Sequence, residues 1–348
     1  MYKKYEMTKI NYFRLTKTKN RYNKENGFGK HFHIKTSQTQ KGKQVKVLNY
    51  GSLNIDYVYS VDHIAQIGET ILSDSLKTFC GGKGLNQSIA LAKAGVAVNH
   101  AGLIGEDGDI LLDICKEYGV DTTYIKKVPA QGGHTIIQVD KEGRNNIILY
   151  GGTNQMQSRE YIDKVLSDFT AGDYLLLQNE INQLDYIIDK AYEKEMRIVL
   201  NPSPFDDKLD KCDFSKIYLF LLNEVEGAQF TGESQPDSMI QMFREKLPDS
   251  KAVLTLGSEG AVYFDSKVEI RQPIFKTEVI DTTAAGDTFT GFFLAGLLKG
   301  FDISETLKIA SKAASIAVSR AGAVNSIPML NEVMESFEKN EKGREREK

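Results

Sequence analysis

Short apolar runs alternate with longer amphipathic stretches along most of this chain. The run Asp-Tyr-Leu-Leu-Leu-Gln at 173–178 is apolar almost throughout, which is typical of a strand covered on both faces. Strands are predicted at 45–50, 97–103, 174–178, 197–201, 217–221 and 252–257, and helices at 85–94, 107–118, 158–169, 182–194, 236–246, 285–299, 303–319 and 328–337. This order predicts an α/β fold: a mainly parallel sheet with helices on both sides, which binds ligands beyond the carboxyl ends of its strands.

Two stretches interrupt the alternation. Residues 55–79 carry no helical pattern, and the segments 135–140 and 145–150 flank Lys-Glu-Gly-Arg, which predicts a β-hairpin. From the residues alone, this can be a plain surface hairpin. An exposed sheet edge there would favour pairing with another strand.

Both ends of the chain differ from the middle. Residues 1–44 are rich in lysine and arginine, contain only Glu6 and Glu25 as acids, and lack apolar periodicity, which predicts a mobile tail. They also lack the apolar core of a secretory signal, so a transit peptide, a loose polyanion contact and a solvated or upstream extension stay open. Residues 339–348 are predicted to form a second, charged tail.

The composition fits an intracellular enzyme. A chain of 348 residues suffices for one large α/β domain with a small appendage, and its formal net charge of −3 gives no overall attraction to nucleic acid or membrane. No apolar run approaches the length that spans a bilayer. Cys80, Cys115 and Cys212 lack metal-ligand spacing, and their odd number argues against a disulfide framework. We therefore predict a cytoplasmic protein without a nucleic-acid or membrane partner, and we expect Cys80 to be a plain buried thiol.

The run Asp281-Thr-Thr-Ala-Ala-Gly-Asp-Thr-Phe289 begins an apolar helix that continues to Leu298. Small residues at the helix start leave the first N–H groups bare, and these donors together with the helix dipole form a natural anion site. Asp287 lies in the same first turn. A carboxylate makes sense beside a phosphate if it takes the proton of a hydroxyl that attacks the phosphate. From these residues alone, an acid that merely favours the positive helix end is an equally good interpretation.

A second glycine-rich turn begins another helix within Gly81-Gly-Lys-Gly-Leu-Asn-Gln-Ser-Ile-Ala-Leu-Ala-Lys-Ala-Gly95. The turn offers a cation, Lys83, and an amide, Asn86, beside backbone N–H groups. It matches neither the Walker A spacing nor the Rossmann Gly-x-Gly-x-x-Gly pattern. Taken alone, a tight turn without a ligand is the commoner interpretation.

Together and in this order, the two motifs resemble those of the ribokinase family of carbohydrate kinases, also called the PfkB family. The resemblance runs from about Val45 to about Pro328. Further landmarks of the family follow in order: Gly51-Ser-Leu-Asn-Ile-Asp56, Leu177-Gln-Asn-Glu180, Asn201-Pro-Ser-Pro204, Asn223-Glu-Val-Glu226, Thr255-Leu-Gly-Ser-Glu-Gly260 and Ala317-Val-Ser-Arg-Ala-Gly-Ala-Val-Asn-Ser326. The resemblance implies a three-layer α/β/α kinase domain at 45–338. It also implies a small β-sheet lid, from about 52–78 and 130–153, that covers the sugar and forms a homodimer contact.

The resemblance implies a role for each residue of the catalytic centre. Asp287 is the expected base on the primary hydroxyl of the sugar, and the N–H groups of Ala284, Ala285 and Gly286 are the expected anion hole for the transferring phosphoryl group. The expected sugar ligands are Asn54, Asp56, Gly82, Lys83, Asn86, Glu180 and Asp287. From the residues alone, Asn54 and Asp56 would instead be turn formers.

The nucleotide and metal sites are implied in the same way. The expected ATP contacts are Asn223, Thr255, Leu256, Gly257, Ser258, Glu259, Gly260, Gly286, Asp287 and Ser311. Glu226 is expected to act on Mg²⁺ through water. An activating potassium ion is expected at Asp281, Thr283, Ala317, Arg320, Gly322 and Ser326. Two simpler interpretations stay open, because Asn223 can cap the helix that follows it and Asp281 can cap its own turn.

The predicted activity is therefore ATP-dependent phosphorylation of a small sugar, with D-ribose converted to D-ribose 5-phosphate. The expected sugar ligands include no aromatic shelf, which favours a polyhydroxylated sugar over a nucleoside. Another acceptor such as fructose or adenosine is the alternative, and a non-catalytic sugar or nucleotide sensor is a third. The missing Rossmann fingerprint disfavours a dinucleotide-dependent oxidoreductase. Gly151-Gly-Thr-Asn154 and Asn179 depart from the usual family pattern, and both are expected near the sugar.

Overall fold

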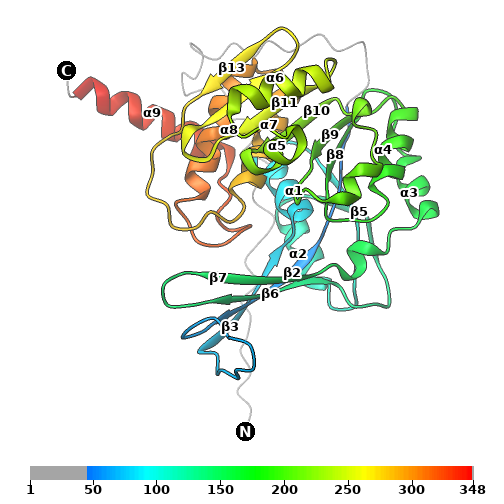
Figure 1. Cartoon of the computed structure of the whole chain (residues 1–348), viewed down its shortest axis with the longest axis vertical. Helices are drawn as coiled ribbons and strands as arrows, with labels where there is room; N and C mark the ends of the chain where they lie inside the picture. The colour runs from blue at the N-terminus through cyan, green and yellow to red at the C-terminus, as the bar shows by residue number, and fades with distance from the viewer. Residues whose placement is uncertain (1–44, 347–348) are drawn as a thin grey trace, which may run out of the picture. The chain divides into compact units, whose positions relative to one another are not determined.

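A computed structural model describes the backbone of residues 45–346 and the side chains of residues 45–338. The predicted N-terminal tail at 1–44 and the last two residues lie outside this part. In the described part, strands and helices alternate as the hydrophobic pattern predicts, and the strands form two separate sheets (Figure 1).

The large sheet has nine strands in the order β13-β12-β11-β10-β9-β8-β1-β4-β5. Neighbouring strands from β11 to β5 pair in parallel, and β12 and β13 add two antiparallel pairings at one edge. The bounds are β1 Val47–Tyr50, β4 Asn99–Ile104, β5 Asp121–Lys127, β8 Tyr174–Gln178, β9 Arg197–Asn201, β10 Leu219–Asn223, β11 Lys251–Thr255, β12 Ala261–Phe264 and β13 Glu269–Gln272. The predicted α/β fold with a mainly parallel sheet is confirmed.

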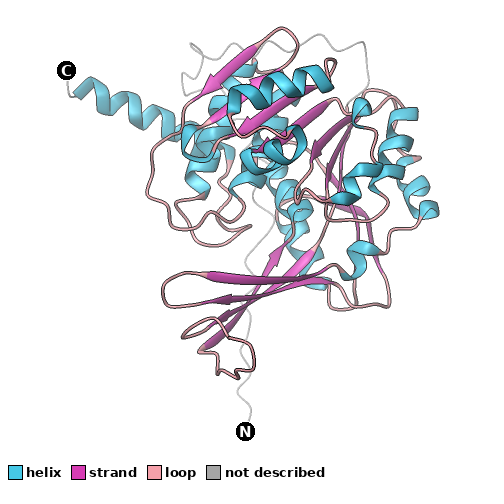
Figure 2. Cartoon of the chain, viewed as in Figure 1, coloured by secondary structure: helices cyan, strands magenta, loops and turns pink. Residues whose placement is uncertain are grey.

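Helices cover both faces of this sheet (Figure 2). Their bounds are α1 Lys83–Lys93, α2 Asp109–Glu117, α3 Arg159–Leu166, α4 Leu184–Glu193, α5 Glu224–Thr231, α6 Pro236–Lys246, α7 Ala285–Leu298, α8 Ile303–Ala317 and α9 Leu330–Arg346. Successive residues of a strand point to opposite faces, so Val47 packs in the core formed by α1, α2, α7 and α8, while Leu48 packs in the core formed by α3, α4 and α6. The sheet is thus buried on both sides, as its apolar strands predict.

The small sheet has the order β3-β2-β6-β7, with bounds β2 Asn54–Ser60, β3 Ser75–Gly81, β6 Gly133–Val139 and β7 Asn145–Tyr150. The predicted hairpin is present as the antiparallel pair β6 and β7. Strands β2 and β3 occupy most of the stretch that showed no helical pattern. The edge strand β7 is exposed along its whole length, including four large apolar side chains, Ile147, Ile148, Leu149 and Tyr150.

Helix α9 is longer than predicted. It continues past residue 337 to Arg346 and so includes most of the segment predicted as a charged tail. This segment is rich in good helix formers such as glutamate, lysine and arginine and has no proline, and the helix continues through Gly343 despite the low helix propensity of glycine. Within the described residues, no helix is both long enough and apolar enough to cross a bilayer.

Candidate active site

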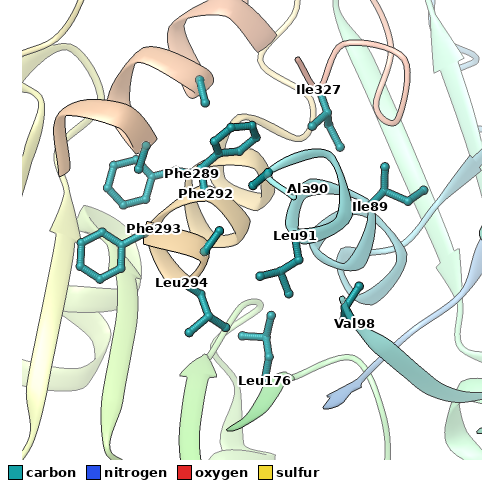
Figure 3. Close-up of a cluster of buried hydrophobic side chains, with 14 of the residues drawn as sticks. Ile89, Ala90, Leu91, Val98, Leu176, Phe289, Phe292, Phe293, Leu294 and Ile327 are labelled. Carbon is teal, nitrogen blue, oxygen red and sulfur yellow. The ribbon is translucent and has the colours of Figure 1, made fainter. Parts of the chain in front are cut away.

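The two glycine-rich motifs meet at the carboxyl edge of the large sheet, where α1 packs against α7. Figure 3 shows the two helices side by side, with Ala90 of α1 facing α7 and Leu91 pointing toward Leu294 and Leu176. The contact is close because α7 carries a glycine there: a Cβ on Gly291 would lie 2.4 Å from the Cβ of Ala90. Packing of this kind places the first turns of both helices together.

Asp287 lies in the first turn of α7 and is only 7% exposed. Its Oδ2 accepts a hydrogen bond from Nδ2 of Asn86 at 3.0 Å, and its Oδ1 accepts one from Nε2 of Gln87 at 2.9 Å. Both donors belong to α1, about 200 positions earlier in the chain. The structure therefore brings together the acid and the amide that the sequence singled out, Asp287 and Asn86. It also adds Gln87, to which the sequence motifs assign no role.

The backbone before Asp287 is open to an anion. Ala284 has φ +59°, in the left-handed region, and no side chain caps this end of α7 among the described residues. A Cβ on Gly286 would meet nothing within 4 Å. The N–H of Ala285, however, donates to the carbonyl of Thr282 at 3.2 Å, so it is already engaged in this conformation. Among the three residues of the predicted anion hole, Gly286 has the surroundings best suited to an anion.

Glu180 holds the start of α1. Its Oε2 accepts hydrogen bonds from the hydroxyl of Ser52 and from the N–H of Lys83, the latter at 3.0 Å. Burial raises the pKa of Glu180, although the Lys83 charge and these hydrogen bonds oppose the rise. Burial alone would lower the pKa of the Lys83 ammonium, but the charges of Asp287, Glu180 and Glu226 outweigh it and raise that pKa. Lys83 thus lies among three carboxylates and stays charged.

Asn54 and Asp56, on the first strand of the small sheet, are each oriented by a neighbour. Oδ1 of Asn54 accepts from Nδ2 of Asn154 at 2.7 Å, so the Asn54 amide nitrogen is the group left to donate. Oδ1 of Asp56 accepts from the hydroxyl of Thr135 at 2.6 Å. Burial raises the pKa of Asp56, and the Thr135 hydrogen bond partly offsets this. A Cβ on Gly81 would lie 1.9 Å from Oδ2 of Asp56, so a larger residue here would displace the Asp56 carboxylate.

The two departures from the family pattern have different surroundings. In Gly151-Gly-Thr-Asn154, Asn154 positions Asn54 and also accepts from the N–H of Leu53. Asn179 is buried, and its amide nitrogen donates to the carbonyl of Pro204 and to Asp206. Asn179 thereby holds the loop after β9, while its Oδ1 is buried without a partner within the described residues, so its expected position near the sugar stays a prediction.

Asn223 and Glu226 form a complete capping box at the start of α5. Nδ2 and the N–H of Asn223 donate to the two carboxylate oxygens of Glu226, both at 3.0 Å, and the Glu226 N–H donates back to Oδ1 of Asn223 at 2.9 Å. The simpler interpretation of Asn223 as a helix cap is thus confirmed. Each carboxylate oxygen of Glu226 keeps lone pairs for water, which is compatible with a water-mediated metal contact.

The predicted nucleotide turn follows β11. Gly257, Ser258 and Glu259 form a short 3₁₀ turn, and the N–H of Leu256 donates to the carbonyl of Gly260 at 2.8 Å. Gly257 and Gly260 have φ +49° and +103°, values that favour glycine. Thr255 bonds the carbonyl of Leu222 at 3.3 Å. On α8, Oγ of Ser311 is buried and has no hydrogen-bond partner within the described residues.

Three of the residues predicted to bind potassium meet directly. Oδ2 of Asp281 accepts the N–H of Gly322 at 2.8 Å, while Oδ1 accepts the N–H of Thr283 at 2.9 Å. Burial alone would raise the pKa of Asp281, but these hydrogen bonds outweigh it and lower that pKa. Asp281 therefore caps its own turn, as the simpler interpretation predicts, and also ties it to the loop after α8.

The remaining predicted potassium ligands contact one another or a structural partner. The carbonyl of Ala317 accepts the Arg320 N–H at 3.0 Å, and the Arg320 side chain pairs with Glu332 at 2.8 Å. Ser326 is buried, and its hydroxyl donates to the carbonyl of Ala323 at 2.8 Å. No group of three or more His, Cys, Asp and Glu residues suited to a metal is found between residues 45 and 338. Any cation here would need backbone carbonyls beside the single carboxylate of Asp281.

All three cysteines are free thiols. Burial raises the pKa of Cys80 to about 11 and those of Cys115 and Cys212 to about 12, so each stays protonated at neutral pH. Cys80 borders a cavity of about 260 Å³ between β3, α2 and the loop at 323–325, and this cavity does not include Asp287. The thiols are thus poor nucleophiles.

Comparison with known proteins identifies relatives over nearly the whole described chain. The sequence model described as pfkB family carbohydrate kinase matches residues 44–330. The ribokinase of Bacillus subtilis is 33% identical over 82% of this chain and 97% of its own, and the deoxyribokinase of Salmonella typhi is 30% identical over 84% of this chain and 98% of its own. Among solved structures, the ribokinase of Cryptococcus neoformans in complex with ADP has a TM-score of 0.75 at 30% identity, covering 84% of this chain and 100% of that one. The Arabidopsis thaliana ribokinase complexed with ribose and ATP has a TM-score of 0.74 at 26% identity, covering 84% and 98%.

Proposed function

This chain belongs to the pfkB family of carbohydrate kinases, and we propose that it transfers the γ-phosphoryl group of ATP to the primary hydroxyl of D-ribose, giving D-ribose 5-phosphate and ADP. The observation that carries the proposal is the buried carboxylate of Asp287 at the uncapped start of α7, held by Asn86 of α1. A base and an anion site within one helical turn are what a hydroxyl attack on a phosphate requires.

In the proposed reaction, Asp287 accepts the proton as the sugar oxygen forms its bond to the γ-phosphorus and the bond to ADP breaks. The N–H groups at 284–286, with Gly286 best placed, stabilise the negative charge of the transferring group. Lys83 adds a fixed positive charge within the cluster of acids. Such a site lowers the barrier mainly by position and electrostatics, because phosphoryl transfer asks little covalent chemistry of the protein.

The sugar is proposed to lie between the small sheet and α1, bound by Asn54, Asp56 and Asn86. Because Asn154 engages Oδ1 of Asn54, the Asn54 amide donates to a sugar oxygen, while Asp56 accepts from a sugar hydroxyl. This pairing of one fixed donor with one fixed acceptor supports a small polyhydroxylated acceptor.

Two cations are part of the proposal. Mg²⁺ arriving with ATP supplies charge neutralisation of the phosphates, and Glu226 would contact it through water. The link between Asp281 and Gly322 supports a potassium ion that fixes the loop beside the anion site, with Thr283, Ala317, Arg320 and Ser326 as the further ligands.

A sugar panel with coupled detection of ADP tests the function. We expect D-ribose to give the highest kcat/KM and adenosine to be poor, because the proposed ligands offer no aromatic shelf. We also expect 2-deoxyribose to be clearly worse than ribose, since a site built around hydroxyls loses a large factor, up to about 10⁴-fold, when one is missing. Because one of the relatives is a deoxyribokinase, the ratio of kcat/KM for ribose and 2-deoxyribose decides which of the two sugars is the acceptor. A higher kcat/KM for 2-deoxyribose, fructose or a nucleoside would overturn ribose as the acceptor and leave a sugar or nucleoside kinase.

A homodimer through the small sheet is proposed from its exposed edge. Strand β7 pairs only with β6 among the described strands, and Ile147, Ile148, Leu149 and Tyr150 are all about half exposed. Burying this apolar edge against a second copy removes it from water and satisfies its free backbone groups. Sedimentation of the purified protein decides the matter, with a monomer at micromolar concentration counting against the dimer.

A further inference from the structure

We propose that Gln87 is a positioning residue for Asp287, and that Gln178 and Asn201 hold Gln87 in the one orientation that serves this purpose. The inference rests on the proposed role of Asp287 as the base. It assigns a function to two fully buried amides, Gln87 of α1 and Gln178 at the end of β8, and to the half-buried amide of Asn201 at the end of β9. All three stand inside the sequence motifs, but the motifs assign none of them a role.

Every polar atom of the Gln87 side chain is engaged. Its Nε2 donates to Oδ1 of Asp287 at 2.9 Å and to Oδ1 of Asn201 at 3.0 Å. Its Oε1 accepts from Nε2 of Gln178 at 2.7 Å. Gln87 and Gln178 are both fully buried, so water does not compete for these groups.

Backbone carbonyls fix the direction of this chain of amides at both ends. Nδ2 of Asn49 donates to the carbonyl of Gly84 at 2.7 Å, so Oδ1 of Asn49 faces Gln178 and accepts from its Nε2 at 2.9 Å. At the other end, Nδ2 of Asn201 donates to the carbonyl of Leu221 at 2.9 Å, which leaves its Oδ1 to accept from Gln87. A carbonyl can only accept, so neither end can be reversed.

The direction of the hydrogen bonds in this series of amides determines which atom of Gln87 faces the Asp287 carboxylate. With Gln178 donating to Oε1 of Gln87, the Gln87 nitrogen must point at the Asp287 carboxylate. A reversed Gln87 would place its oxygen against two other oxygens, those of Asp287 and Asn201. The orientation of the Gln87 amide thus follows from the network and is not an arbitrary assignment.

Asn86 differs from Gln87 in this respect. It donates to Oδ2 of Asp287, but its own Oδ1 is buried and has no partner within the described residues. The Asn86 amide can therefore turn to meet a substrate, whereas Gln87 cannot. We assign Oδ1 of Asp287 to anchoring by Gln87 and Oδ2, on the Asn86 side, to receiving the proton.

The first variants are Gln87→Leu and Asp287→Asn, measured with ribose and ATP in steady state. Gln87→Leu keeps the side-chain size and removes the hydrogen bonds, and we expect kcat to fall about 10- to 100-fold with KM for both substrates within about 3-fold, since a small misplacement of a catalytic group has effects of this size. Asp287→Asn fits the same space, because its oxygen can accept from Gln87 and its nitrogen can donate to a turned Asn86 amide.

The double variant separates positioning from general structural damage. If Gln87 acts through Asp287, adding Gln87→Leu to Asp287→Asn should lower kcat by less than about 3-fold more, because there is no base left to position. A full multiplicative loss would overturn the inference. Gln157→Leu is the matched control: Gln157 is 3% exposed and accepts from the Tyr50 hydroxyl at 3.0 Å, away from Asp287, and we expect its kcat within about 2-fold of wild type.

Gln178→Met provides a second route if Gln87→Leu does not fold. It removes the donor that orients Gln87 without touching Asp287, and we expect a several-fold lower kcat at unchanged KM. A kcat equal to that of wild type in Gln178→Met, and in Gln87→Leu if that variant folds, would overturn the positioning role of Gln87. The assignment of Asp287 as the base would still stand. Activity of Asp287→Asn within a few-fold of wild type instead defeats the proposed base itself, so the two failures are distinguishable.

Discussion

Replacing Gly291 by alanine should damage both stability and activity, because this glycine sets the distance between the two helices of the site. A Cβ at this position would lie 2.4 Å from the Cβ of Ala90 and 2.9 Å from the N–H nitrogen of Leu91. Both contacts are far inside the normal van der Waals separation, and both neighbours are part of or attached directly to the α1 backbone. No side-chain rotation can relieve them, so α1 and α7 must separate by about 1 Å.

The magnitude follows from two opposing effects. Alanine favours a helix over glycine by about 1 kcal/mol, and overpacking a tight core costs about 1–3 kcal/mol. Because the clash involves backbone, we expect the second effect to prevail, with a net loss of about 1–2 kcal/mol in the free energy of unfolding. Gly291 lies four residues after Asp287, and Ala90 lies four residues after Asn86. The contact between the helices is therefore about one turn from the hydrogen bond between Asp287 and Asn86, and moving the helices apart at the contact also lengthens that bond. Stretching that 3.0 Å bond by about 1 Å should lower kcat about 10-fold or more.

Denaturant unfolding and steady-state kinetics of Gly291→Ala measure both effects. Gly286→Ala is the control for stability, because it also replaces a glycine of α7 by alanine but a Cβ there meets nothing within 4 Å. We expect Gly286→Ala to be at least as stable as wild type even if its activity falls. A Gly291→Ala protein as stable as Gly286→Ala would refute the reasoning, since it would mean that α1 and α7 separate without cost.

Two further predictions concern the loop after α8. If Asp281 and this loop hold potassium, exchanging sodium for potassium at constant ionic strength should raise the activity of dialysed enzyme, and a flat response would count against the site. Lys93 donates to the carbonyls of Val324 and Ile327 at 2.9 and 2.8 Å, and burial lowers its pKa to about 8. The unfolded chain keeps that proton to about pH 10, so between pH 8 and 10 the unfolded state binds more protons and the free energy of unfolding should rise with pH by on the order of 1–2 kcal/mol. Lys93→Met should lack this rise in denaturant unfolding, and parallel pH dependence in the two proteins would contradict the prediction.

The hydrophobic pattern gave several buried elements their observed bounds, but it missed the buried strand β12 as well as two more polar elements. The strands at 174–178 and 197–201 and the helix at 236–246 have the predicted bounds, because burial forces an apolar pattern on them. Strand β5 was missed since it is an edge strand with polar residues, Asp-Thr-Thr-Tyr-Ile-Lys-Lys, and much of it is exposed. Helix α5 is not among the helices predicted from the hydrophobic pattern, because its eight residues, Glu224–Thr231, contain few apolar positions and no clear amphipathic stripe. Only the interpretation of Asn223 as a helix cap anticipated it.

The candidate site was predictable only as far as single motifs carry it. Asp287 and Asn86 stand in recognisable glycine-rich turns, and their proximity follows once both turns lie at the same edge of a parallel sheet. The partners that orient the site, Gln87 and Thr135, were given no role from the sequence, although Gln87 stands inside the second glycine-rich motif. Thr135 bonds Asp56 because the two are register partners in the pairing of β2 with β6, and strand register between distant segments is not readable from either segment alone.

Buried polar atoms without a hydrogen-bond partner indicate which side chains of the site are available to a substrate. A buried polar atom without a hydrogen bond costs about 1–3 kcal/mol, so folding alone disfavours it. Between residues 45 and 338, eight buried side-chain atoms lack a partner, and two of them, Oδ1 of Asn86 and Oγ of Ser311, belong to residues of the proposed site. Gln87, one residue from Asn86, has every polar atom paired. Adjacent amides on one helix thus differ because one is committed to the protein, where it holds the base, and the other keeps an acceptor that a substrate hydroxyl can satisfy.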